Sequence, residues 1–161
     1  MFEYHGQPYE KVTIEQTDWG AMKGTAQAGE FQSLPMIEVR ATGGQTRELA
    51  GMQAILRSFG MRFGYYKGSD WRQAMLIDPI IETWMDLMKE QAKIVFNLEV
   101  SDEEKRALMR TYAEGIVTKF HTLCETQLSR LGGGSSTFMA GESVTIVDFV
   151  MCSYAANTIY N

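Results

Sequence analysis

The chain has 161 residues, of which 45% are hydrophobic and 22% are charged. A globular chain of this length buries about two thirds of its unfolded surface, in one compact unit or two small subdomains. The net charge of −5 and the lack of any Lys and Arg run argue against binding to nucleic acid or to anionic membranes. No apolar run reaches the roughly 18 residues that span a bilayer, and the N-terminus lacks the features of a secretion signal. We therefore expect a cytoplasmic protein without membrane insertion.

The first half of the chain predicts strands followed by a helix. Val12 and Ile14 alternate with polar residues in the segment 9–15, and residues 34–39 form a short apolar run, so both segments read as strands. Residues 46–49 are predicted to form a third, weaker strand. Beyond them the apolar spacing becomes helical.

The second half predicts helices throughout. Residues 71–98 place apolar side chains at intervals of three and four, which predicts a long helix with one apolar face. Pro79 lies inside this pattern and predicts a kink or an early boundary there. Ser101 and Glu104 have the spacing of a capping box, and they predict the start of a second long helix that ends near Leu131.

The segment "GESVTIVDF" predicts the start of a last helix. Thr145 is placed to cap it by accepting a hydrogen bond from a first-turn amide, while Asp148 reaches back to the N–H of Thr145. Val144 and Phe149 have the spacing of a hydrophobic staple across the same turn. The purpose of this arrangement is structural.

The two cysteines, Cys124 and Cys152, both lie in predicted helices. In a reducing compartment we expect buried free thiols rather than a disulfide. His121 precedes Cys124 by three residues, so both side chains share one helix face. Two ligands do not make a zinc site, and we expect ordinary packing and no metal.

Four motifs occur along the chain in the order found in cytosolic glutathione transferases, and the sequence resembles that family from Phe2 to about Tyr160. Within the family, the resemblance is to sigma-class members. The motifs resemble, in turn, the second strand and its following loop, the third strand with its cis-proline, the helix that closes the thioredoxin-like domain, and the start of the central helix of the C-terminal domain. They read "QPYEKVTIEQTDW", "SLPMIEV", "AILRSFGMRFGYY" and "FMAGESVTIVDF".

The resemblance implies an α+β, mainly helical fold in two parts. Residues 1–66 correspond to an incomplete thioredoxin-like subdomain that lacks the family's first strand, and residues 70–161 to the all-α helical bundle. On this alignment the chain is shortened at both ends, so the family's last helices are also absent. Loss of a central strand leaves unpaired sheet edges. A partner strand, a rearranged sheet or tethering in an assembly would each compensate.

The resemblance also implies where glutathione would bind. Trp19 matches the Trp beside the glutathione site, and Lys23 matches a Lys that meets the glycine carboxylate. The backbone next to a cis Leu34–Pro35 bond would pair with the cysteinyl part, although an ordinary trans proline stays the alternative. Asp86 would reach across a dimer interface towards the amino group of the ligand. Taken singly, Trp19 is better explained as a core aromatic residue, and Lys23 and Asp86 as solvated surface charges.

Two departures from the family put the chemistry in doubt. No residue matches the catalytic Tyr, and neither Tyr4 nor Tyr9 lies in its place. The Gln-Ser pair that binds the γ-glutamyl end falls on Gly51 and Met52, which lose hydrogen bonds to charged groups worth about 1.5–3 kcal/mol each. A competing register places the pair on Gln45-Thr46, but it requires six extra residues before the helix.

Three hypotheses follow. We favour a degenerate transferase-like module, a pseudoenzyme with a structural or interaction role that needs no cofactor and has a protein partner or forms a homodimer. The alternative is an active transferase or isomerase that uses glutathione. The third is an α-rich globular domain whose short matches are coincidental.

Overall fold

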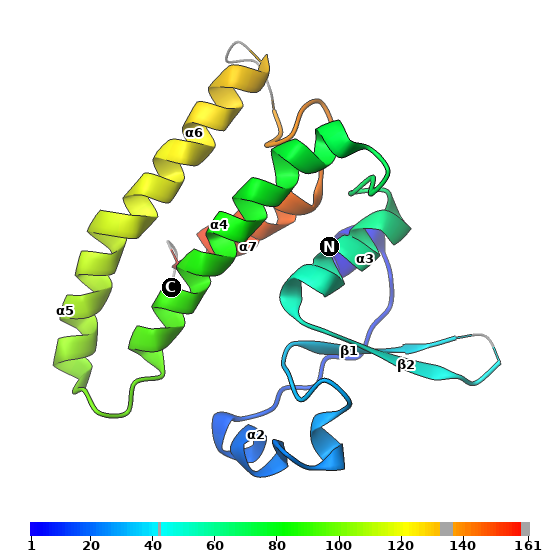
Figure 1. Ribbon diagram of the computed structural model, residues 1–161, viewed down its shortest axis with the longest axis vertical. Helices are drawn as coiled ribbons and strands as arrows, with labels where there is room; N and C mark the ends of the chain where they lie inside the picture. Colours follow the sequence, from blue (N-terminus) through cyan, green and yellow to red (C-terminus); the bar gives the residue numbers. More distant parts are fainter. Residues whose placement is uncertain (42, 133–136, 159–161) are drawn as a thin grey trace. The chain divides into compact units, whose positions relative to one another are not determined.

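The computed structural model describes residues 1–41, 43–132 and 137–158 (Figure 1). Contacts divide the chain into two compact units, Met1–Tyr66 and Lys67–Asn161. The first unit combines a small sheet with short helices, and the second is helical in its described part. The predicted α+β, mainly helical fold is confirmed.

The first unit has six regular elements among its described residues. They are α1 (Phe2–His5), α2 (Gln16–Met22), the 3-10 helix η1 (Ala26–Ala28), β1 (Met36–Arg40), β2 (Thr46–Ala50) and α3 (Met52–Phe63). The two strands pair antiparallel, with Ile37 opposite Leu49 and Val39 opposite Arg47. The strand predictions for residues 34–39 and 46–49 are therefore confirmed to within a residue or two at each end. The face of the sheet that carries Ile37 and Val39 is the apolar one.

The helix α3 completes the core of this unit. Its buried side chains lie at helical spacing and include Ile55, Leu56 and Phe59. Contacts join α3 to both strands. Phe59 also packs against Phe2 of α1, with ring centroids 4.7 Å apart.

The strand predicted for residues 9–15 is wrong. No regular structure occurs from residue 7 to residue 15, and Val12 is 72% exposed. Alternating Val and Ile show only that a segment is suited to a half-buried sheet surface. A strand also needs a neighbour for its N–H and C=O groups, and the main chain of residues 9–14 has none in the described part of the chain.

The described part of the second unit consists of helices joined by short connections. They are α4 (Trp71–Val95), α5 (Asp102–Tyr112), the π-helix η2 (Ala113–Val117), α6 (Thr118–Gly132) and α7 (Ile146–Thr158). Most of the predicted apolar face of α4 is buried, including Ile77, Ile81 and Leu87, but Met75 at the start of this pattern is exposed. Pro79 lies inside α4, so the predicted early boundary is wrong.

The second long helix is continuous from Asp102 to Gly132, but its middle turn is a π-helix. The capping box is confirmed: the Ser101 hydroxyl accepts from the Glu104 N–H at 3.3 Å, and the Glu104 carboxylate accepts from the Ser101 N–H at 2.9 Å. Tyr112 lies just before the π-helix. Its buried hydroxyl donates to the Leu87 carbonyl at 2.9 Å, which ties α5 to α4, and burial raises the pKa of Tyr112.

The start of α7 is held by one carboxylate. Asp148 accepts from the Thr145 N–H and the Thr145 hydroxyl, each at 2.8 Å, and from the Met139 N–H at 2.9 Å. The predicted reach of Asp148 back to Thr145 is confirmed. The Thr145 hydroxyl, however, donates to Asp148 instead of accepting from a first-turn amide. Thr145 is only 1% exposed, so its two donors are buried, whereas Asp148 is partly buried.

Both cysteines are free, as predicted, but only Cys124 is buried. Cys152 lies on an exposed position of α7, so its predicted burial is wrong. Burial raises the pKa of Cys124 to about 11. We therefore expect one fast-reacting thiol per chain at pH 8, because thiolate is the reactive form.

Alkylation followed by peptide mass spectrometry measures this difference. Cys152→Ser should remove the fast phase and leave Cys124 unmodified in the folded protein. Rapid labelling of Cys124 in that variant would contradict the burial of its thiol.

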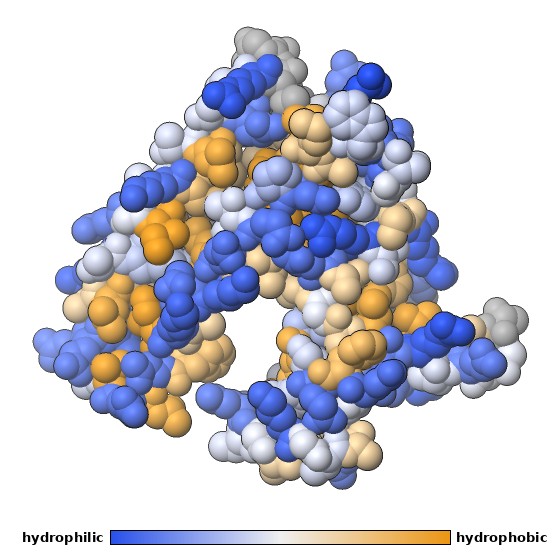
Figure 2. Space-filling view, viewed as in Figure 1, coloured by the Kyte–Doolittle hydropathy of each residue, from blue (hydrophilic) through white to orange (hydrophobic). Residues whose placement is uncertain are grey.

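Some large hydrophobic side chains of the second unit remain exposed. Leu108, Ile116 and Leu123 lie along the consecutive elements α5, η2 and α6. Figure 2 shows hydrophobic surface over α5 and α6 among the hydrophilic side chains. Within the described residues, no helix has the length and apolar character needed to cross a membrane.

Candidate functional site

Four of the five predicted site residues belong to the first unit. Trp19 is half-buried on α2, and Lys23 is the exposed residue that follows this helix. The Lys23 N–H donates to the Trp19 carbonyl at 2.9 Å, so the two residues lie on successive turns. Leu34 and Pro35 come immediately before β1. Lys23 therefore presents its cation at the surface within one turn of the Trp19 ring.

The Leu34–Pro35 peptide bond is cis, as predicted. The Pro35 carbonyl accepts from the Gly51 N–H at 2.9 Å, next to the first pair of the β1–β2 ladder. Leu34 is 41% exposed, and its own N–H and C=O have no hydrogen-bond partner in the part of the chain that the structure describes. These two main-chain groups can therefore hydrogen-bond to an extended ligand backbone.

The loop between Lys23 and Leu34 is closed by the side chain of Gln32. Its amide oxygen accepts from the Gly24 N–H at 2.6 Å, and its amide nitrogen donates to the carbonyls of Thr25 at 2.9 Å and Gly29 at 2.6 Å. Gln32 has φ 49°, a left-handed conformation that costs a residue with a Cβ about 1–2 kcal/mol. The three hydrogen bonds hold this loop in shape.

We expect Gln32→Ala to destabilise the protein by about 1–3 kcal/mol, because it removes these bonds and keeps the left-handed conformation. Gln32→Gly loses the same bonds but relieves the backbone, so it should be less harmful. Urea unfolding compares the two variants. Gln27→Ala, at an exposed position of the same loop, is the matched control and should change the unfolding free energy little. Equal unfolding curves for the wild type and Gln32→Ala would contradict this role.

Asp86, the fifth predicted residue, belongs to α4 in the second unit. Its carboxylate lies 2.9 Å from the Lys89 ammonium, and the Asp86 side chain is 75% exposed. The hydrogen bond that the Lys89 ammonium donates to Asp86 raises the pKa of Lys89. Such surface pairs contribute little to stability. Contact of Asp86 with a ligand amino group stays a prediction.

The residue that caps the start of α3 and the first residue of this helix have no polar side chain. Gly51 is the N-cap residue with φ 87°, Met52 is the first helical residue, and no side chain caps this end. The competing pair, Gln45-Thr46, lies at the other end of β2, where Thr46 pairs with Arg40. Gly51 and Met52 therefore occupy the first two positions at this end, and neither offers a side-chain hydrogen bond. The next residue, Gln53, has an amide side chain, and its oxygen accepts from the Arg57 guanidinium at 3.2 Å.

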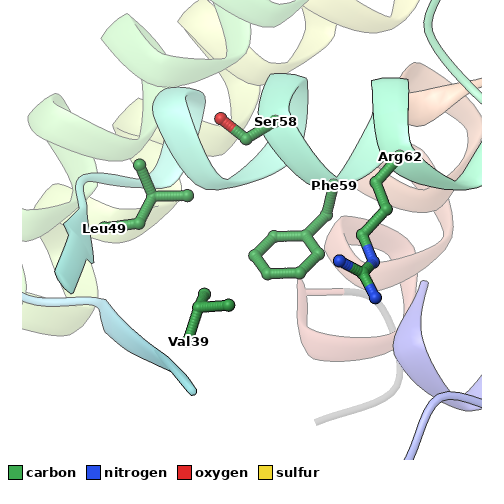
Figure 3. Close-up of a pocket in the computed structure, with 5 residues that line it drawn as sticks. All are labelled: Val39, Leu49, Ser58, Phe59 and Arg62. Atoms are coloured by element: carbon green, nitrogen blue, oxygen red, sulfur yellow. The ribbon is translucent and has the colours of Figure 1, made fainter. Parts of the chain in front are cut away.

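A hollow of about 160 Å³ lies between the sheet and α3, and it contains none of the predicted residues (Figure 3). Its lining comes from β1, β2 and one side of α3. The residues are Val39, Leu49, Ser58, Phe59 and Arg62. The sequence analysis did not predict this hollow, because alternating apolar residues in strands and a row of apolar residues on a helix are typical of a buried core. Among the described residues, no cluster of His, Cys, Asp and Glu could hold a metal ion.

Comparisons with known proteins agree with this architecture. No protein-family model matches the chain. "Probable glutathione S-transferase 5" of Caenorhabditis elegans is 25% identical over 160 residues, which cover 99% of this chain and 72% of the relative. A Nu-class glutathione transferase from Haemonchus contortus is 26% identical with a TM-score of 0.71, over 99% of this chain and 72% of that chain.

A sigma-class transferase from Fasciola hepatica has a TM-score of 0.74 at 22% identity, over 98% of this chain and 72% of its own, and supports the fold. These similarities extend over both units, and the motif order and cis Leu34–Pro35 bond agree with them. The chain is therefore similar to glutathione S-transferases over nearly its whole length, and it shares their fold.

Proposed function

We propose that this chain is a transferase-like module with a structural or interaction role, and that it does not conjugate glutathione. The observation that carries the proposal is the start of α3, where Gly51 and Met52 provide no side-chain hydrogen bond. On the family alignment this is where the γ-glutamyl end of glutathione would bind. Loss of each hydrogen bond to a charged ligand group costs about 1.5–3 kcal/mol, or roughly tenfold to a hundredfold in affinity.

Exposed hydrophobic side chains support an interaction role. Trp71 and Met75 are both exposed and lie one turn apart on α4. Leu108, Ile116 and Leu123 add exposed apolar surface along the second long helix. Exposed apolar side chains are found at many sites of protein association.

A second candidate function is a glutathione-dependent transferase or isomerase. The unpartnered N–H and C=O of Leu34 favour it, together with Trp19 and Lys23 of the same unit. This function also needs a hydrogen-bond donor that stabilises the thiolate of glutathione. The Tyr9 hydroxyl is unsuited, because it donates to Glu3 at 2.9 Å and this bond raises the pKa of Tyr9.

Retention on immobilised glutathione, followed by turnover of a chloronitrobenzene with free glutathione, discriminates the two functions. We expect the natively purified chain to pass through the column and to show no turnover above the uncatalysed rate. The same preparation should give a far-UV circular dichroism spectrum rich in helix, which excludes unfolding as the cause. Retention together with turnover would favour the enzyme and contradict the proposal.

A further inference from the structure

The connection between α4 and α5 carries three exposed hydrophobic side chains within four residues. They are Val95, Phe96 and Leu98. At 85% exposure, Leu98 is the most exposed large hydrophobic side chain among the described residues. Figure 2 shows hydrophobic surface at this end of α5, bordered by hydrophilic side chains. We call residues 95–104 the α4–α5 tip.

Hydrogen bonds give the α4–α5 tip a defined shape. The Asn97 side chain accepts from the Glu99 N–H at 2.9 Å, which closes a turn around Leu98. The capping box fixes the start of α5 a few residues later. The bond from the Tyr112 hydroxyl to the Leu87 carbonyl ties α5 to α4. Because the tip is held before a partner arrives, binding would cost little main-chain freedom.

The charges of the α4–α5 tip are all negative. The tip contains four carboxylates and neither Lys nor Arg, and it is followed on α5 by Lys105 and Arg106. The acidic residues are Glu99, Asp102, Glu103 and Glu104. Glu104 belongs to the capping box, whereas the other three have no ion-pair partner in the part of the chain that the structure describes. Acids suit the positive end of a helix dipole, but Glu99 lies outside α5.

This pattern distinguishes the tip from the other exposed hydrophobic side chains of the second unit. Leu108, Ile116 and Leu123 follow one another at intervals of seven or eight residues, so their apolar surface is spread along the second long helix. Cations also lie among them, including Lys119. Only the α4–α5 tip combines closely spaced apolar side chains with charges of one sign.

An apolar centre bordered by carboxylates suits a partner with the opposite charge. An amphipathic helix with Lys or Arg beside its apolar face would cover Phe96 and Leu98 and bring cations to Glu99 and Glu103. A bilayer would also accept exposed apolar side chains, but anionic lipids would repel the carboxylates. The charges therefore favour a basic protein segment.

We propose that the α4–α5 tip binds a basic amphipathic helix of another protein. The inference rests on the proposed interaction role and deepens it by naming the surface and the chemistry of the partner. Retention on glutathione tests the proposed function separately. If the helix fails to bind and glutathione is still not retained, the docking surface is overturned while the lack of conjugation stands.

Fluorescence anisotropy with a labelled synthetic peptide tests the binding to the full chain. The probe is a helical peptide of Leu and Lys with its leucines on one face, and the matched peptide carries Glu in place of Lys. We expect saturable binding of the Lys peptide only. Higher salt should weaken it, because salt screens exposed charges.

Leu98→Ser tests the apolar part of the surface. We expect it to weaken binding of the Lys peptide at least about tenfold, as for the loss of a central apolar contact. Leu123→Ser makes the same change at an exposed position of α6 and should leave the affinity unchanged. Both side chains are exposed, so neither variant should alter the far-UV circular dichroism spectrum.

Glu99→Lys/Glu103→Lys tests the charges. The double variant should weaken binding at least about fivefold at low salt and less at high salt. Glu114→Lys/Glu125→Lys changes the net charge by the same amount at exposed positions outside the tip. A smaller effect of this control shows that the position of the charges matters, not the net charge alone.

Three results would overturn the proposal. The first is no saturable binding of the Lys peptide by the wild type. The second is equal affinity of each tip variant and its control. The third is binding of the wild type to phosphatidylcholine vesicles that Leu98→Ser abolishes, since the tip would then bind a membrane instead of a protein helix.

Discussion

Asp148→Ala is expected to destabilise the second unit by about 2–4 kcal/mol. The substitution leaves three donors without their acceptor, namely the Thr145 N–H, the Thr145 hydroxyl and the Met139 N–H. Loss of a cap typically costs about 0.5–2 kcal/mol, and a buried donor left unsatisfied costs about 1–3 kcal/mol. Thermal and urea unfolding followed by circular dichroism measure the change.

Glu142→Ala is the matched control for Asp148→Ala. Glu142 is an exposed acid in the same loop, so its loss should change stability by no more than about 0.5 kcal/mol. Asp148→Asn keeps one acceptor oxygen and should fall between the two. Equal unfolding midpoints for Asp148→Ala and Glu142→Ala would show that the carboxylate does not organise the start of α7.

The second large effect concerns glutathione affinity. The double substitution Gly51→Gln/Met52→Ser returns an amide and a hydroxyl to the start of α3, and we expect it to raise glutathione affinity at least about tenfold. The gain is partly offset because residue 51 has φ 87° and ψ 130°, a backbone conformation that costs a Gln of the order of 1–3 kcal/mol. Met52→Ser alone avoids this strain and should show a smaller gain.

Equilibrium dialysis with radiolabelled glutathione compares these variants. Met61→Ser is the control, because it makes the same change at an exposed position near the other end of α3. If the double variant binds no better than Met61→Ser, then Gly51 and Met52 do not occupy the γ-glutamyl subsite. The proposed function would lose its main support.

Local sequence patterns predicted the elements that depend on local interactions. The capping box of Ser101 and Glu104 needs only a spacing of three residues, and it is present as predicted. The buried stripe of α4 follows from helical periodicity in the same way. The strand prediction for residues 9–15 was wrong, because a strand needs a pairing partner from a distant part of the sequence. An alternating apolar pattern does not show whether such a partner exists.

The features of the candidate site also differ in how far the sequence could predict them. The cis Leu34–Pro35 bond was predicted from the resemblance to a family, since general statistics favour trans. The hollow at Val39 and Phe59 was missed because its residues come from three elements, each of which looks like ordinary core by itself. Nor does any local pattern predict the three-way hydrogen bonding of Gln32, which depends on its left-handed backbone.

The central claim is that this transferase-like chain lacks the side chains that bind glutathione. A nitrogen-15 NMR titration of the wild type with reduced glutathione tests it most directly, with the Trp19 indole and the amides of Lys23, Leu34 and Gly51 as reporters. We predict small, non-saturating shifts up to millimolar ligand. Saturable shifts at all four reporters in the micromolar range would contradict the claim and indicate a complete glutathione site.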